Sequence, residues 1–272
     1  MEAIQNADDN VYLAETKPTI HITVRPNYVK IECNERGFSK DNIQALCRTG
    51  RSSKPLGGGY TGEKGIGFKS VFKIAKRAHI RSPPYYFQLD QDRELGMITP
   101  QWDQAYFDKY PQEHQTTIIL DGMCGNSKDF SHALQEDIES VNPVILLFLR
   151  RIDCLHLTLY QSSSPAAEPT VSYRFRQEGR SIESGITSLI DDVSGPICNF
   201  FKVKHPKLVL GREPRRPDAI LTEVVLAFPV ELEHSSSVAR DEESSWVPRD
   251  EPQDTFAYLP IGKFGFKVST VA

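Results

Sequence analysis

The segment from Gly59 to Ser70 constrains the fold of this chain more than any other part of the sequence. It reads GYTGEKGIGFKS, with glycines at 62, 65 and 67 directly before an apolar helical pattern at Val71, Phe72 and Ile74. Glycines leave backbone N–H groups unshielded, and at a helix start these groups and the helix dipole favour a phosphate. So many glycines beside a helix start are costly unless something binds, so the segment predicts a phosphate loop, with a structural turn as the alternative.

Two better-known phosphate loops fit this segment poorly. Gly57 to Gly62 matches G-x-G-x-x-G, but it follows a loop of Ser, Lys and Pro, and no acidic residue stands about twenty residues further on. The Rossmann interpretation is therefore weak, because that motif must follow a strand. The P-loop needs Lys after its last glycine, and the residue here is Glu63.

The first residues predict a helix over residues 2 to about 14. On such a helix Glu2, Asn6 and Asp9 stand at i, i+4 and i+7 and share one face. Two carboxylates and an amide oxygen on one stripe form a hard-oxygen site suited to Mg²⁺ held partly through water. One carboxylate would remain to orient a nucleophilic water molecule. A solvated polar helix face is the alternative, since small and apolar residues line the other side.

Strands and helices follow in an order typical of a mixed protein. We expect strands at 20–24 and 28–33 joined by Pro26-Asn27, and then a helix with Ser39 as N-cap and Asn42 in the capping-box position. Further strands are expected at about 78–82, 85–89, 116–120, 154–160, 171–175, 207–210, 221–230 and 256–261. A helix is expected at roughly 128–141, and an apolar turn at 143–149.

The run from Glu32 to Phe38, ECNERGF, lies where the second strand ends. Gly37 can adopt a positive φ angle there, and its missing side chain lets a flat ligand approach the backbone closely. A simple strand-to-helix turn explains the same residues equally well.

In combination and in this order, these elements resemble the GHKL superfamily of ATPases, which includes the ninety-kilodalton heat-shock chaperones, MutL and histidine kinases. The residues of these motifs are most similar to those of the sacsin and NO VEIN branch, at positions 4–10, 34–38, 50–54 and 62–72. The ATPase motifs cover about residues 2–120, and the resemblance beyond them is looser.

The resemblance implies an α+β fold, the GHKL (Bergerat) two-layer α/β sandwich with a mixed or antiparallel sheet. We expect an ATP-binding domain over residues 1–160, incomplete at its N-terminus because the chain opens inside a helix. Residues 161–272 are expected to form a β-rich segment, also incomplete, with an exposed loop at about 234–254.

The resemblance also assigns roles by position. Glu2 would be the general base for water attack on the γ-phosphate, Asn6 the Mg²⁺ ligand, and residues 50–62 the lid. Nucleotide contacts would come from Asp9, Cys33, Asn34, Glu35, Gly37, Gly62, Lys64, Gly65, Gly67, Phe68 and Thr116. Thr117 is the neighbouring alternative to Thr116. Cys33 stands where relatives have an Asp that recognises adenine, and a thiol is a poor acceptor, so Asn34, Glu35 or a backbone carbonyl would take that role.

Composition excludes several other classes of protein. The formal net charge of −4 gives no reason to expect nucleic acid or an anionic membrane as a partner. The longest apolar stretch, Val144 to Leu149, is too short to cross a bilayer. Five widely spaced cysteines predict reduced thiols in an intracellular protein, cytoplasmic or nuclear.

We therefore expect binding of Mg-ATP, with slow hydrolysis coupled to lid closure as a conformational switch. The alternative is a non-hydrolysing interaction module that keeps the fold, and an ordinary α+β scaffold is the third interpretation. A protein client or self-association is a further expectation. The sequence leaves the enzyme question open, because Glu2 stands in the first turn of its helix, where backbone donors lack partners.

Overall fold

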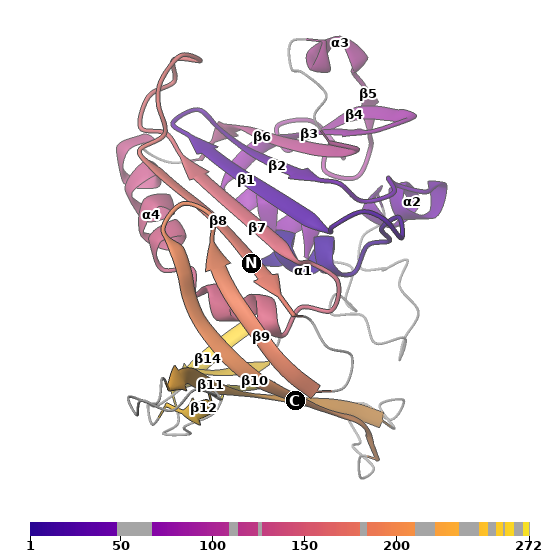
Figure 1. The fold of residues 1–272 in the computed structure, drawn as a ribbon. Coiled ribbons are helices and arrows are strands. Elements are labelled where there is room, and N and C mark those ends of the chain that lie inside the picture. Colours follow the sequence, from indigo (N-terminus) through magenta and orange to yellow (C-terminus); the bar gives the residue numbers. More distant parts are fainter. Residues whose placement is uncertain are drawn as a thin grey trace. The chain divides into compact units, whose positions relative to one another are not determined.

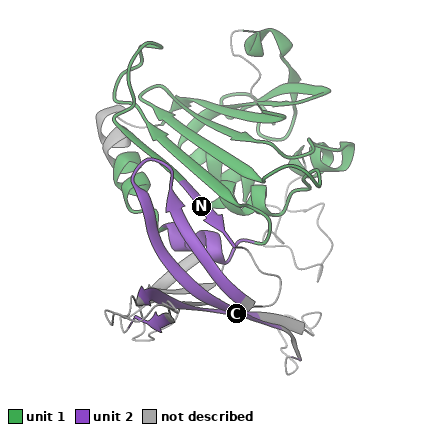
Figure 2. Cartoon of the chain, viewed as in Figure 1, with its two compact units in different colours: residues 1–142, 150–174 green, residues 143–149, 175–272 purple. Residues whose placement is uncertain are grey.

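The computed structural model describes residues 1–47, 67–108, 114–124, 127–179, 184–209, 221–233, 245–249, 254–257, 259–263 and 269–271. Over these residues the fold is mixed α+β, with a large sheet and few helices. The chain divides into two compact units, shown in Figure 2. The first unit comprises residues 1–142 and 150–174, and the second comprises residues 143–149 and 175–272.

The first unit is built on a mixed sheet. Its strands are β1 (Thr19–Arg25), β2 (Tyr28–Cys33), β3 (Ala75–Ser82), β4 (Tyr85–Asp90), β5 (Gln101–Trp102), β6 (Thr116–Met123) and β7 (Cys154–Leu159). They run side by side in the order β7-β1-β2-β6-β3-β4-β5 (Figure 1). Neighbouring strands are antiparallel except β1 and β7, which are parallel. The expected mixed sheet is therefore present.

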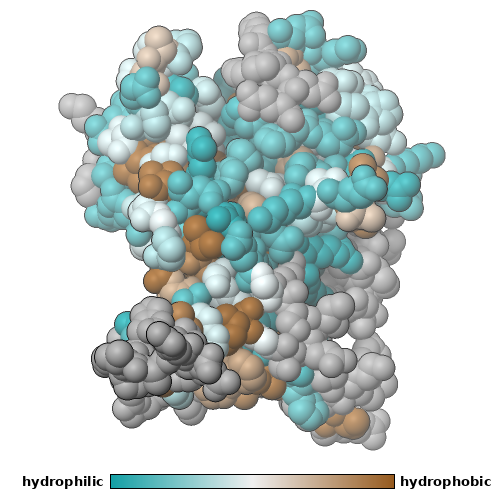
Figure 3. Space-filling model, viewed as in Figure 1, coloured by the Kyte–Doolittle hydropathy of each residue, from teal (hydrophilic) through white to brown (hydrophobic). Residues whose placement is uncertain are grey.

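Helices of the first unit lie on both faces of its sheet. The first unit has α1 (Glu2–Asp8), α2 (Lys40–Cys47), the 3-10 helix η1 (Phe68–Lys73), α3 (Gln104–Phe107) and α4 (Ser127–Glu139). Figure 1 shows α1 and α4 behind the sheet. Ile4 of α1, Ile20 of β1 and Leu155 of β7 are buried in the core between the two layers. The opposite face is largely hydrophilic (Figure 3), because side chains along a strand alternate between faces.

Helix α1 is shorter than the sequence pattern indicates. The prediction of a helix to about residue 14 is wrong, since the helix ends at Asp8 with Asp9 as its C-cap. The cause lies far away in the chain. The Arg151 guanidinium donates hydrogen bonds to the carbonyl oxygens of Asp9, at 2.9 Å, and Asn10. Carbonyl groups at a helix end need such partners, and these ones find them outside the helix.

The capping box of α2 is confirmed. The Ser39 Oγ accepts a hydrogen bond from the Asn42 backbone N–H at 3.2 Å, and the Asn42 Oδ1 accepts one from the Ser39 N–H at 2.8 Å. Asn42 thus forms the reciprocal bond for which Glu or Gln is the commoner choice.

The second unit is β-rich. It contains the 3-10 helix η2 (Pro143–Leu147), the end of β8 (Val171–Glu178) from Phe175 onward, and the strands β9 (Ser184–Asp191), β10 (Gly195–Val209), β11 (Leu221–Glu233), β12 (Ser245–Pro248), β13 (Asp254–Ala257), β14 (Leu259–Lys263) and β15 (Ser269–Val271). Their order is β8-β9-β10-β11-β15-β13-β14, with β12 also on β11. The Lys202 Nζ of β10 donates to the Leu147 carbonyl at 2.7 Å, which ties η2 to these strands.

Two expectations for this unit need correction. Part of the loop expected at 234–254 is strand β12, because Trp246 and Val247 pair with Leu232 and Glu231 of β11. The strand expected at 207–210 is the end of the much longer β10, whose register shifts between His205 and Leu208. Helices long and apolar enough to span a membrane do not occur in the described part of the chain.

Candidate functional site

Glu2 of the predicted helix face and Gly67 of the predicted phosphate loop lie together in the first unit. Asn6 Nδ2 lies 3.5 Å from Glu2 Oε1 on α1. A Cβ atom built on Gly67 would fall 1.5 Å from that same carboxylate oxygen. Gly67 is the N-cap of η1, and Phe68 is its first residue. The Glu2 carboxylate therefore occupies space that any larger residue at position 67 would need.

Asp8 anchors α1 to a distant segment, and sequence reasoning missed this role. The side chain is only 2% exposed. Its oxygens accept hydrogen bonds from the backbone N–H groups of Arg150 at 2.9 Å, Arg151 at 2.7 Å and Ile152 at 3.0 Å. Asp9, the neighbouring candidate residue, is also buried. Backbone donors carry no sequence signature, so only the structure reveals this partner.

Cys33 packs at the other end of α1. The Tyr12 hydroxyl donates to the Ala7 carbonyl at 2.8 Å and lies 3.0 Å from the Cys33 Sγ. Burial raises the pKa of the Cys33 thiol to about 12, and burial likewise raises the pKa of Tyr12. Both groups therefore stay neutral at physiological pH.

Asn34 has its amide committed to the backbone. Its Oδ1 accepts from the Thr19 N–H at 2.8 Å, and its Nδ2 donates to the Lys17 carbonyl at 2.9 Å. These two bonds hold the chain at the start of β1.

Glu35 is a buried carboxyl group with one oxygen that makes no hydrogen bond to the described residues. It is 4% exposed, and its Oε1 has no hydrogen-bond partner among the described residues. Burial raises its pKa to about 7, against the opposing effect of hydrogen bonds with Thr116 and Asn10. An unsatisfied buried polar atom is costly, and such atoms are unusual in folded proteins.

Thr116 connects Glu35 to the neighbouring strand. The Thr116 and Ser82 hydroxyls lie 2.8 Å apart, and the Phe38 N–H donates to the Ser82 Oγ at 2.7 Å. Gly37 has a φ angle of +98°, the positive value that the sequence suggested. A Cβ there would lie 3.3 Å from Gln115 Nε2. Buried hydroxyls and a bare backbone thus line this end of the site.

Thr117, the alternative to Thr116, faces the other side of the sheet. Its hydroxyl accepts a hydrogen bond from Arg81 at 3.0 Å. The adjacent residue of β6 alternates in direction, as strand geometry requires. Gly62, Lys64, Gly65 and the whole expected lid, residues 50–62, lie outside the described residues.

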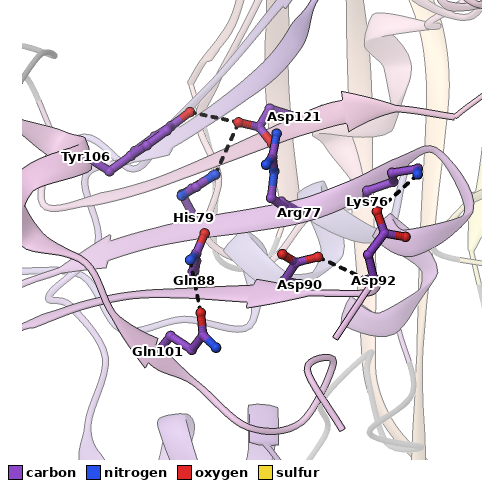
Figure 4. A network of polar contacts seen from close by, with 9 residues as sticks. All are labelled: Lys76, Arg77, His79, Gln88, Asp90, Asp92, Gln101, Tyr106 and Asp121. Carbon is purple, nitrogen blue, oxygen red and sulfur yellow. Dashed lines mark hydrogen bonds and ion pairs between the residues drawn. The ribbon is translucent and has the colours of Figure 1, made fainter. Parts of the chain in front are cut away.

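The open face of the sheet carries a separate polar network (Figure 4). Asp121 accepts hydrogen bonds from Arg77 at 2.7 Å, His79 at 3.2 Å and Tyr106 at 3.3 Å. The Tyr106 ring stacks on His79 with centroids 3.6 Å apart. Burial raises the pKa of Asp121, but the bonds from His79 and Arg77 outweigh it and leave the pKa lowered. This carboxylate has its countercharge in place, which is typical of a structural role.

Within the described ranges, no group of three or more His, Cys, Asp or Glu side chains is arranged to hold a metal ion. The predicted Mg²⁺ ligand is of another kind, a single amide oxygen on Asn6.

Three comparisons bear on identity. No family model matches the chain. The chain is similar to Protein NO VEIN of Arabidopsis thaliana, with 32% identity over 175 residues. The match covers 57% of this chain and 6% of that protein, so this chain spans a small part of its relative. The match supports the resemblance to the NO VEIN branch.

Among solved structures, the chain is similar to the crystal structure of the N-terminal domain of a DNA repair protein. The TM-score is 0.44 and the identity is 14%, over 96% of this chain and 72% of the other. A likeness at this level indicates neither a shared function nor a shared partner.

Proposed function

We propose that the first unit binds Mg-ATP between α1, β2, β6 and the start of η1, as a GHKL-type sandwich would. One observation carries the proposal. The Glu2 carboxylate lies against Gly67, and the buried Glu35, which is hydrogen-bonded to Thr116, has one oxygen, Oε1, without a partner among the described residues. A helix start with glycines favours a phosphate, and a buried side chain with an unused oxygen suits a base that donates a hydrogen bond.

The adenine would lie at the Glu35 end. Gly37 has no side chain of its own, the Gln115 side chain lies over it, and Thr116 and Ser82 supply hydroxyls beside it. Cys33 and Tyr12 would provide neutral walls. In this arrangement Glu35 takes the role that the resemblance gives to an Asp at position 33.

The metal and the phosphates would lie at the Asn6 end. Because the Asn6 Nδ2 faces Glu2, its Oδ1 faces away from that carboxylate and is a suitable oxygen ligand. Mg²⁺ retains several waters and takes few protein oxygens, so one amide oxygen fits its needs. When bound, the ion would neutralise charge on the phosphates.

Hydrolysis would depend on Glu2. Held against Gly67, its carboxylate could accept a proton from a water molecule that attacks the γ-phosphate. The second candidate function is a module that binds the nucleotide without hydrolysing it.

The first experiment is calorimetry of Mg-ATP with the chain, the Asn6→Ala variant, and Asn27→Ala as a matched control in the exposed β1–β2 turn. We expect saturable binding that weakens in Asn6→Ala and is unchanged in Asn27→Ala. A folded chain that binds no Mg-ATP would refute the proposal.

Phosphate release then separates the two candidates. We expect Glu2→Gln to reduce hydrolysis by about 100-fold while keeping ATP affinity, as loss of a general base does. Exposed Glu15→Gln is the control. No release by the unaltered chain would favour the non-hydrolysing module. Chromatography with and without ATP tests whether a client or second copy joins the nucleotide-bound form.

A further inference from the structure

The C-terminal end of α1 is held by hydrogen bonds that run in both directions. The Asp8 carboxylate accepts from three consecutive backbone N–H groups, those of residues 150–152. In return, the Arg151 guanidinium donates from one nitrogen, Nη1, to the carbonyl oxygens of Asp9 and Asn10. We call these five hydrogen bonds the α1 clamp. They join the end of the helix to a segment more than 140 residues further along the chain.

Tertiary contacts decide where α1 lies, because a helix of seven residues is not stable by itself. Ile4 and Ala7 pack into the core beneath it. Apolar packing is non-directional, so it tolerates small shifts and rotations of the helix. Hydrogen bonds are directional and have a narrow range of lengths. The α1 clamp therefore fixes where the last turn of the helix lies.

Asn6 belongs to that last turn, two residues before Asp8. We propose that Arg151 is a positioning residue for the metal ligand, because through the α1 clamp it holds the Asn6 Oδ1 where it can reach the ion. The inference rests on the proposed function, and it adds a residue outside the nucleotide motifs on which metal-dependent binding depends. Arg151 acts here through α1 and makes no contact with the nucleotide.

Arg151 separates positioning from stability better than Asp8 does. Loss of the Asp8 carboxylate would leave buried N–H groups without an acceptor, which destabilises the whole fold. Arg151 is exposed, so water can reach the carbonyl oxygens that lose its guanidinium. We therefore expect Arg151 variants to fold, with the last turn of α1 no longer held in one position.

The test is calorimetry of ATP, with Mg²⁺ and with EDTA, on the unaltered chain and on Arg151→Met. Met keeps an apolar stem and removes the donors. We expect Mg-ATP affinity to fall about tenfold, as the loss of well-placed hydrogen bonds implies, while ATP affinity in EDTA stays within about threefold. Arg151→Lys keeps a cationic donor on a shorter side chain and should recover part of the loss. Exposed Arg93→Met is the control and should match the unaltered chain.

A double-mutant cycle distinguishes positioning from a general loosening of the fold. If Arg151 acts through Asn6, Arg151→Met should lower Mg-ATP affinity no further in an Asn6→Ala background. A loosened fold would instead lower affinity in both backgrounds, and in EDTA as well. Circular dichroism shows whether each variant is folded.

Hydrogen exchange of the ligand-free chain gives a readout that needs no nucleotide. The backbone N–H groups of Asp9 and Asn10 donate to carbonyl oxygens of Gln5 and Ala7 at the end of α1. We expect these two amides to exchange faster in Arg151→Met and at the original rate in Arg93→Met, because exchange reports local opening.

The outcomes separate the two proposals. Unchanged Mg-ATP affinity in folded Arg151→Met, or additive losses in the cycle, overturns the positioning role and leaves the proposed function in place. If Arg151→Met does not fold, Arg151→Lys is taken through the same cycle, and the same two results overturn the role. Absence of Mg-ATP binding by the folded, unaltered chain overturns the proposed function together with the inference.

Discussion

The two faces of the first unit's sheet both bury charged and polar side chains, but they satisfy them differently. On the open face two carboxylates have a cation, with the Lys30 Nζ 2.7 Å from Glu32 and the Arg77 Nε 2.7 Å from Asp121, although the Glu32 Oε1 has no hydrogen-bond partner among the described residues. On the helix face Glu35 has only neutral partners and one unused oxygen. Asp8, on the same face, has backbone N–H partners.

This difference teaches which polar groups to suspect of function. Charges that neutralise one another, as Arg77 and Asp121 do in the network of Figure 4, have no need of a charged ligand. A buried acid without a countercharge is energetically unfavourable, and acids with perturbed pKa values of this kind concentrate at functional sites. By this criterion we propose that the site lies on the helix face.

The largest expected effect comes from removing the Asp8 carboxylate, whose hydrogen bonds are all satisfied on the helix face. Asp8→Ala removes the acceptor of three backbone N–H groups, and buried donors without partners cost about 1–3 kcal/mol each. We expect the free energy of unfolding to fall by about 4 kcal/mol. Denaturant unfolding measures it, with exposed Asp41→Ala as the control. A loss below about 1 kcal/mol would mean that water replaces the carboxylate and that the anchor is not structural.

The next prediction separates catalysis from stability on the helix face. Gly67→Ala places a methyl group where the Glu2 carboxylate lies. That carboxylate is the end of a flexible side chain, so it can move at small cost to stability. We expect phosphate release to fall about 100-fold while ATP affinity stays within about threefold, because general-base catalysis depends on position.

A double-mutant cycle sharpens the Gly67→Ala test. In a Glu2→Ala background the substitution should have no further effect on hydrolysis, because the displaced group is already absent. Additive losses in the double variant would show that Gly67 acts through something other than Glu2.

The third prediction compares the two faces through adjacent residues of one strand. Thr116→Val removes a hydroxyl that contacts Ser82 and Glu35, whereas Thr117→Val removes one that accepts from Arg81 on the open face. We expect ATP affinity to fall about tenfold in Thr116→Val, the loss of one buried hydrogen bond. Thr117→Val should leave it unchanged. Equal losses would remove the distinction between the faces.

The local elements of the fold were predictable because their signals are local. Alternation of apolar residues predicts β1 and β2 within a residue of their observed ends. The Ser39 and Asn42 capping box follows from three-residue spacing. The length of α1 could not be predicted, because Arg151, more than a hundred residues away, supplies the partners that end it.

The candidate site divides in the same way. Glu2, Asn6 and Gly67 follow from spacing and glycine content, and the structure brings Glu2 to Gly67. The choice among Asn34, Glu35 and a backbone carbonyl could not be made from the sequence, since it depends on which groups find partners across the sheet. The bonds of Asn34 to Lys17 and Thr19 are of this kind.

The smallest expected effect comes from a histidine cluster on the open face. Its contribution to stability depends on pH in the opposite direction to that of Glu35. The His21 ring lies 4.2 Å from His156 and 4.6 Å from His114, measured between centroids. Burial, and then these two rings, lower the His21 pKa to about 3. A lowered folded-state pKa means that its contribution to stability is complete above the unfolded pKa of about 6.5 and is lost as pH falls toward 3.

We therefore expect the unaltered chain to lose stability between about pH 7 and about pH 5, and His21→Gln to lose less. The difference should be on the order of 1 kcal/mol, because the partly exposed ring is screened by solvent. Denaturant unfolding at both pH values measures it, with exposed His205→Gln of the second unit as the control. Glu35 has a raised pKa, so its ionisation destabilises the fold as pH rises instead. If His21→Gln loses as much stability between the two pH values as the unaltered chain, the acid-sensitive group lies elsewhere. The three histidine rings would then make no pH-dependent contribution to stability.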